Sequence, residues 1–317
     1  MIYTIRHSTR FAYSEPVREN VTEVRLNPVS LGIQRCFSFR LSVWPPVPVS
    51  SYSDQYQNRI HHFNIPYDHR AQVITAESIV GIRQSQKPLD QQVLDLSWAD
   101  LDAQVSDSEL LEWVIPSDFT EPTPLLEQLK TELAISREMK PFELAMETSY
   151  RLFKALKYLP NSTRFDSPID EAISQRAGVC QDYSHIMLAL LRSVGFPCRY
   201  VSGYLYHAIT SNHQSPDTAS HAWVEAWFPG LGWLGLDPTN NKLAGDHHIV
   251  IAYGRDYADV PPTRGVFKGS ARTEMAISVR IVPEETIIES DVFRVIHDDK
   301  DVDAKPATPT YAGSQQQ

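Results

Sequence analysis

Apolar and polar residues alternate in short runs over the first 80 or so positions of the chain. Such period-two runs are typical of half-buried β-strands, and turn-forming residues separate them. The runs cover residues 2–13, 21–28, 36–44, 58–65 and 71–80. Several short strands at this spacing predict a β-sandwich-like N-terminal domain over residues 1–85.

The pattern changes after this region. Residues 86–124 are acidic and broken by prolines, and we interpret them as a connector. Apolar residues then recur at three- and four-residue spacing in residues 125–133 and 142–156, which predicts helices. A third helix is predicted within residues 167–178 from its N-terminal capping pattern.

Strand patterns return after the helices, and they lie at residues 198–206, 220–228, 232–238, 247–254 and 275–283. Helices followed by strands predict an α+β core over residues 125–270, which is then followed by a C-terminal strand region at residues 271–296. The polar tail at residues 297–317 is rich in small residues and is predicted to be disordered.

Cys180 stands at the joint between a turn-prone lead-in and an amphipathic helix. Tyr183, Met187 and Leu190 form one apolar stripe of that helix, and Cys180 heads the stripe. The first turn of a helix offers unpaired N–H groups and a positive dipole end, which favour the nucleophilic thiolate. The same N–H groups can bind the oxyanion of an acyl-transfer intermediate. Taken alone, the stretch also fits a packed structural cysteine.

Two further candidates lie on a pair of predicted strands joined by a tight turn. His221 begins the first strand and Asp237 ends the second. An odd number of loop residues places the two side chains diagonally adjacent on one face, within hydrogen-bond reach, whereas an even number places them on opposite faces. In the first register, a thiol, an imidazole and a carboxylate form a nucleophile, a base and an orienting group.

Composition narrows the possible partners. The 317 residues are 42% hydrophobic, which is enough for a proper core, and the net charge is −10. An acidic surface argues against nucleic acid or an anionic membrane as the main partner. The N-terminus has no secretory pattern, and no apolar run approaches the length of about 18 residues that a membrane span needs. Three widely spaced cysteines do not make a disulfide framework, so we expect a reduced, cytoplasmic chain.

The residues around these candidates resemble the transglutaminase-like superfamily, in the bacterial branch that is provisionally described as cysteine proteases. The resemblance rests on three blocks in order, which read "RAGVCQDYSHIMLALLRSVGFPCRYVSGYL", "SHAWVEAW" and "GWLGLDPTN". It is strong over residues 165–241, and residues 254–269 and the N-terminal β region are also similar to that branch. It implies a papain-like core with Cys180 as nucleophile, His221 as base and Asp237 as orienting residue.

Other residues near the predicted triad are weaker candidates. Trp223, Trp227 and Trp233 are close to it in sequence, and they are predicted either to wall a substrate cleft or to pack the sheet. Tyr158 and Gln175, upstream of the cysteine, are candidate second donors to the oxyanion.

No metal or cofactor is expected. The pairs His61–His62 and His247–His248 lack metal-ligand spacing and have no cysteine beside them. The spacing of an EF-hand calcium loop is also missing from the sequence.

The predicted chemistry is acyl transfer through a thioester, on an amide of a peptide or protein substrate. Water as acceptor makes the protein a peptidase or amidase, and a primary amine makes it a cross-linking or ligating transferase. The same three residues serve both reactions. The protease-like branch and the lack of an obvious amine site favour hydrolysis. A non-catalytic binding scaffold is the third alternative, and the sequence does not predict the oligomeric state.

Overall fold

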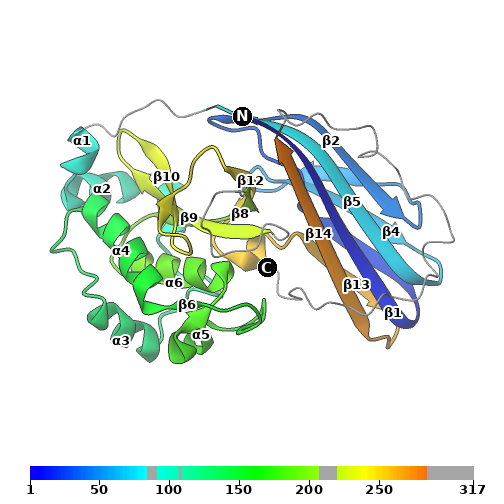
Figure 1. Ribbon diagram of the computed structural model, residues 1–317. Coiled ribbons are helices and arrows are strands. Elements are labelled where there is room, and N and C mark those ends of the chain that lie inside the picture. The colour runs from blue at the N-terminus through cyan, green and yellow to red at the C-terminus, as the bar shows by residue number, and fades with distance from the viewer. Residues whose placement is uncertain (84–90, 107–108, 207–219, 284–317) are drawn as a thin grey trace.

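The computed structural model describes residues 1–83, 91–106, 109–206 and 220–283. Helices gather at one end of the molecule and long strands at the other, with a five-stranded sheet between them (Figure 1). The α+β class predicted from the sequence is confirmed. The predicted tail at residues 297–317 lies outside the described residues.

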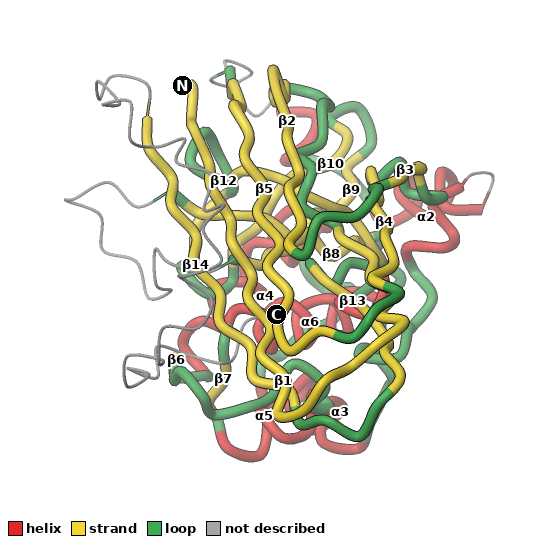
Figure 2. Tube along the Cα trace, turned by 90° about the vertical axis from the view of Figure 1, so that its right-hand side faces the viewer, coloured by secondary structure: helices red, strands yellow, loops and turns green. Residues whose placement is uncertain are grey.

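Antiparallel strands make up the N-terminal domain. Their bounds are β1 (Ile2–Val24), β2 (Gln34–Trp44), β3 (Ser50–Ser53), β4 (Arg59–Ile65), β5 (His69–Ile82), β13 (Thr263–Lys268) and β14 (Thr273–Pro283). The path runs β2-β5-β1-β4-β3, and β13 and β14 also pair with β1. Strands β14, β1, β5 and β2 run side by side along this domain (Figure 2).

The long strand β1 gives this domain its two layers. Its first half pairs with β5 and β14, and its second half pairs with β4 and β13, after a register break between Ala12 and Val17. Ile74 of β5 shares a buried apolar cluster with Val24 and Phe63 from the other half. The domain is therefore sandwich-like, and buried residues alternate along β1 and β5 with the period of two that predicted them.

The end of the described chain returns to the N-terminal domain. Strand β13 pairs with the second half of β1, and β14 pairs with the first half over residues 3–13. The predicted core over residues 125–270 therefore includes one strand that hydrogen-bonds within the N-terminal sheet.

The predicted connector contains short helices packed on the core. They are α1 (Gln91–Leu94), α2 (Trp98–Ser106) and the 3-10 helix η1 (Glu109–Trp113). Leu101 of α2 is fully buried in the main apolar cluster, and the Trp98 indole donates a hydrogen bond to the Met139 carbonyl at 2.8 Å. These helices were not predicted because the prolines and acidic residues of this segment are typical of a connector.

Four helices cover the core. They are α3 (Pro124–Glu132), α4 (Pro141–Ala155), α5 (Ile169–Gln175) and α6 (Cys180–Arg192). Thr123 caps α3 by accepting a hydrogen bond from the Leu126 N–H at 3.1 Å. Helix α5 has Pro168 at its N-cap, which has no polar side chain, and Ser167 accepts a hydrogen bond from the Arg164 N–H instead of capping the helix.

Helix α6 packs on the central antiparallel sheet, and all of its residues are buried. The sheet runs β11-β10-β9-β8-β12. The bounds are β8 (Cys198–Leu205), β9 (His221–Phe228), β10 (Gly232–Asp237), β11 (Lys242–Leu243) and β12 (His248–Gly254). A small parallel pair, β6 (Lys157–Tyr158) and β7 (Ala177–Gly178), leads into α6, and a 3-10 turn, η2 (Tyr257–Asp259), follows β12.

The helices of the described residues fall short of a membrane span. None combines the length and the apolar character that crossing a bilayer requires.

Candidate active site

A tight turn places Cys180 at the first position of α6. Gly178 ends β7 and is needed there, because a Cβ at this position would lie 2.7 Å from the Asp182 Cβ. The Asp182 carboxylate closes the turn by accepting hydrogen bonds from the Val179 N–H at 2.7 Å and the Thr163 hydroxyl at 2.6 Å. Burial raises the pKa of Asp182 to about 6, against the opposing effect of these donors.

The thiol itself lies just below the surface. Cys180 is 7% exposed, and it occupies the first turn of α6, where backbone N–H groups lack helical partners. Cys198 is fully buried, and burial raises its pKa to about 11. Cys36 lies on β2, in the N-terminal domain, and all three cysteines are free thiols.

The β9–β10 hairpin brings His221 and Asp237 together. Residues 229–231 form its loop, and Leu236 pairs with Val224. The loop has an odd number of residues, so His221 and Asp237 lie on the same face of the hairpin. The His221 Nε2 atom lies 2.8 Å from Asp237 Oδ2, and both side chains are buried. The other ring nitrogen, Nδ1, is thereby left for a different partner.

Asp237 holds His221 in its charged form. Burial alone lowers the pKa of His221, but the Asp237 carboxylate, with a smaller contribution from Cys180, outweighs burial and raises it to about 10. In turn, His221 and His248 hold the pKa of Asp237 far below its ordinary value against the effect of burial. The His221 Nδ1 is buried without a well-formed hydrogen bond, so the influence of Cys180 reflects proximity rather than a closed bond. In active sites, hydrogen bonds that are long without substrate often tighten only when substrate binds.

A second imidazole, which the sequence analysis did not identify, also reaches Asp237. His248 Nε2 lies 3.2 Å from Asp237 Oδ2. The Gly245 N–H donates to His248 Nδ1 at 3.2 Å, so Nε2 carries the proton and donates to the carboxylate. His248 begins β12, eleven residues beyond Asp237 in the chain, and only the fold brings it there.

Three side chains of this site each offer one atom of a type that binds metal ions. The ligand atoms of His221, Asp237 and His248 lie within 4.8 Å of one another. Hydrogen bonds already join both imidazoles to Asp237 Oδ2, which also accepts one from the Asn240 amide at 2.8 Å. A carboxylate oxygen satisfied by three donors is arranged for orienting imidazoles rather than for binding a cation.

The two candidate oxyanion donors differ in position. Tyr158 lies on β6, where its backbone pairs with Gly178, and the charge of Cys180 helps burial raise the pKa of its hydroxyl. Tyr158 is therefore close to the thiol. Gln175 is exposed at the end of α5, and its amide donates a long hydrogen bond of 3.4 Å to Glu171 on the same helix.

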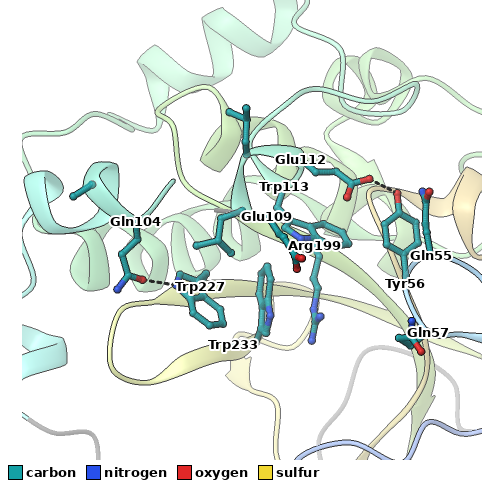
Figure 3. A pocket seen from close by; sticks show the side chains of 13 residues that line it. Gln55, Tyr56, Gln57, Gln104, Glu109, Glu112, Trp113, Arg199, Trp227 and Trp233 are labelled. Carbon is teal, nitrogen blue, oxygen red and sulfur yellow. Dashed lines mark hydrogen bonds between the residues drawn. The ribbon is translucent and has the colours of Figure 1, made fainter. Parts of the chain in front are cut away.

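Two of the three predicted substrate-binding tryptophans line a cavity of about 1190 Å³. Trp227 and Trp233 form one wall with Arg199, and η1 supplies the opposite wall (Figure 3). Trp223 does not line it, because this side chain is 1% exposed and packs with Val201 and Tyr253.

Two protein-family models match this chain. Residues 3–81 match the bacterial transglutaminase-like N-terminal region, and residues 128–238 match the transglutaminase-like superfamily. An uncharacterised protein of Mycobacterium tuberculosis is 32% identical over 297 residues, which cover 89% of this chain and 93% of that protein. The chain belongs to the transglutaminase-like superfamily.

Two further proteins are similar to this transglutaminase-like chain. A solved structure from Cytophaga hutchinsonii, provisionally described as a cysteine protease, matches with a TM-score of 0.69 at 19% identity and covers 89% of this chain and 91% of that chain. At that identity the likeness shows the fold alone. The protein-glutamine gamma-glutamyltransferase of Pseudomonas aeruginosa is 37% identical over 86 residues, 25% of this chain and 12% of that protein.

Proposed function

We propose that the protein is a cysteine-dependent acyl transferase that hydrolyses an amide of a peptide or protein through a thioester. One observation supports this most directly. Asp237 binds His221 through Nε2, which leaves Nδ1 for a thiol that stands at the start of α6. Nucleophile, base and orienting group then have the order that thioester chemistry needs.

The resting pair in this mechanism is a Cys180 thiolate beside a His221 imidazolium. The thiolate attacks the amide carbonyl carbon, a C–S bond forms, and the carbonyl π electrons move to oxygen. When the tetrahedral intermediate collapses, the C–N bond breaks and the imidazolium gives its Nδ1 proton to the leaving amine. Neutral His221 then takes a proton from water as the water oxygen attacks the thioester carbon. Collapse of this second tetrahedral intermediate breaks the C–S bond, releases a carboxylic acid and restores the thiolate–imidazolium pair.

The oxyanion is stabilised by donors near the thiol. The first N–H groups of α6 lack helical partners and carry the positive end of the helix dipole. The Tyr158 hydroxyl is the side-chain donor that we assign to the same oxygen, because β6 pairs with the strand that leads into Cys180. Gln175 is left out of this assignment because its side chain is on the surface.

Amine transfer is the second candidate reaction. The likeness to the Pseudomonas aeruginosa glutamyltransferase favours it over the short stretch that is shared. We prefer hydrolysis because transfer needs a second channel to the Cys180 thioester, one that binds the amine and excludes water. A binding scaffold without catalysis would not require the buried His221–Asp237 pair to remain intact.

The partition of the acyl-enzyme tests these alternatives. A glutamine-containing peptide library is incubated with the protein, with and without a millimolar primary amine, and products are identified by mass spectrometry. Free acid should dominate in both cases, and Cys180→Ala should abolish it. Predominant isopeptide product would establish transfer instead, and no product above the protein-free background from either the wild type or Cys180→Ala would favour a scaffold. We place this reaction in the cytoplasm, where thiols stay reduced.

A further inference from the structure

The cavity beside Trp227 and Trp233 is separate from the thiol centre. None of the three residues assigned to thioester chemistry lines it. Trp227 lies six residues after His221 on β9, which is roughly 20 Å along an extended strand. Trp223, between them on the same face, is 1% exposed, so this face of the strand is closed between the two sites.

Four aromatic side chains, those of Tyr56, Trp113, Trp227 and Trp233, line the cavity. Trp233 lies edge-on to two others, with ring centroids 5.7 Å from Trp113 and 5.3 Å from Trp227. Tyr56, from the N-terminal domain, is 5.1 Å from Trp113. The faces of such rings carry partial negative charge and attract cations, and tryptophan does so most strongly.

Arg199 shows that this wall already accommodates a cation. Its guanidinium carbon lies 4.2 Å from the Trp233 ring centroid and 3.6 Å from that of Tyr253. Glu225 accepts hydrogen bonds from its Nε at 2.8 Å and its Nη2 at 2.6 Å. Because the two side chains neutralise each other, this pair adds no net charge to the cavity.

The remaining charges of the lining are negative. Glu109 and Glu112 come from η1, on the wall opposite Trp227 and Trp233 (Figure 3). The Tyr56 hydroxyl donates to Glu112 at 2.8 Å, which fixes one carboxylate at the edge of the aromatic wall. Two carboxylates beside four aromatic rings are complementary to a positive charge on an organic chain.

We propose that this cavity binds the side chain of a lysine or arginine in an extended peptide. Its volume of about 1190 Å³ exceeds one side chain, and Gln55 and Gln57 also line it, so amide groups are available for the peptide backbone. The claim that this cavity recognises the substrate rests on the proposed function. The claim that it binds a cationic peptide does not depend on the chemistry of Cys180.

Calorimetry on the full chain carrying Cys180→Ala separates binding from turnover. The ligands are acetyl-Gly-Gly-Lys-Gly-Gly-amide, the same peptide with uncharged norleucine in place of lysine, and cellotetraose as a neutral stacking ligand. The lysine peptide should bind about tenfold more tightly than the norleucine peptide, since the cation adds to the contact with the rings. High salt should reduce this preference.

Two variants locate the effect. The double variant Glu109→Gln/Glu112→Gln keeps the shape of the lining and should bring the lysine peptide to the level of the norleucine peptide. The control Glu121→Gln removes an exposed charge outside the lining and should leave the preference intact. Equal binding of the two peptides, binding of neither, stronger binding of cellotetraose, or an unchanged preference in the double variant would overturn the proposal.

The same ligands distinguish this proposal from the proposed function. If the lysine peptide binds as expected but the wild-type chain forms no acyl-enzyme with any peptide, the cavity stands and the thioester chemistry fails. If lysine-containing and norleucine-containing substrates are cleaved with the same KM, the chemistry stands and the cavity has no part in recognition.

Discussion

The Asp237 carboxylate accepts hydrogen bonds on both oxygens, and this determines the arrangement of the residues around it. Backbone N–H groups of Thr239 and Asn240 donate to Oδ1 at 3.1 and 3.2 Å. On Oδ2, two imidazoles and the Asn240 amide converge. A buried carboxylate with this many donors stays charged and cannot rotate, so it fixes the ring orientation of His221.

His248 tests this interpretation. We expect His248→Phe, which keeps a planar ring but removes the donor, to raise the pKa of His221, because the anionic charge on Asp237 is then shared among fewer donors. Turnover should fall about tenfold as the carboxylate loses one of its constraints. NMR titration of the His221 ring reads the first effect directly.

The control for this substitution is the neighbouring histidine. His247 is partly exposed and lies near Asp246 rather than Asp237. His247→Gln should leave both the His221 titration and turnover unchanged. An unshifted His221 in His248→Phe would mean that His248 only fills space.

Stability should depend on pH through His221. Its pKa rises from an ordinary 6.5 to about 10 in the folded protein, where Asp237 outweighs burial. The folded state therefore holds this proton more tightly, and the stabilisation is complete below pH 6.5 and is lost as pH rises toward 10. Urea unfolding of the wild type and His221→Gln should show a stability difference that shrinks over this range. A difference that stays constant would contradict the raised pKa.

The thiols should also differ in reactivity. We expect iodoacetamide to modify Cys180 near neutral pH faster than Cys36 and Cys198, because only Cys180 stands at a helix start beside the His221 imidazolium. Burial raises the pKa of both other thiols, which slows them. Peptide mapping by mass spectrometry gives the three rates. Equal rates, or no loss of the Cys180 advantage in His221→Ala, would argue against an activated nucleophile.

At the element scale, local patterns predicted most of what positions the site. Apolar spacing and the Gly178 turn placed Cys180 at the start of a helix, where the structure has it. Alternation and a short loop allowed the register that joins His221 to Asp237. These features depend on residues close together in the chain, so periodicity and turn chemistry are sufficient to find them.

Elements that depend on distant partners could not be predicted in this way. The helices α1 and α2 are short, and burial of Val93 and Leu101 against the core holds them. His248 looks like an ordinary residue at a strand start, and its partner Asp237 is across the sheet in a different strand. Trp223 and Trp227 share a strand face, yet only tertiary packing buries the first and leaves the second in a cavity wall.

At the scale of the whole molecule, the N-terminal domain covers the edge strand that carries His248. Strand β12 is the last in its sheet, so one edge has unpaired backbone groups. The Gln34 amide pairs with both the N–H and the carbonyl of Val250 at 2.8 Å. The Asn58 amide does the same for Tyr253, at 2.8 and 2.7 Å. Two side-chain amides thus take the place of a neighbouring strand.

This arrangement predicts that the interface between the two domains supports the candidate active site. Asn58→Ala leaves the N–H and carbonyl of Tyr253 without partners in a buried place, and we expect the free energy of unfolding to fall by about 2–4 kcal/mol, since each such group costs roughly 1–3 kcal/mol. Asn64→Ala, on the exposed side of β4, is the matched control and should change stability little.

Because β12 also positions His248, the His221 pKa should move in Asn58→Ala in the direction expected for His248→Phe. Urea unfolding and the NMR titration measure the two effects. If Asn58→Ala unfolds like Asn64→Ala, the amide pairing does not hold the edge strand. If stability falls while His221 titrates unchanged, the N-terminal domain stabilises the core without positioning the residues of the candidate active site.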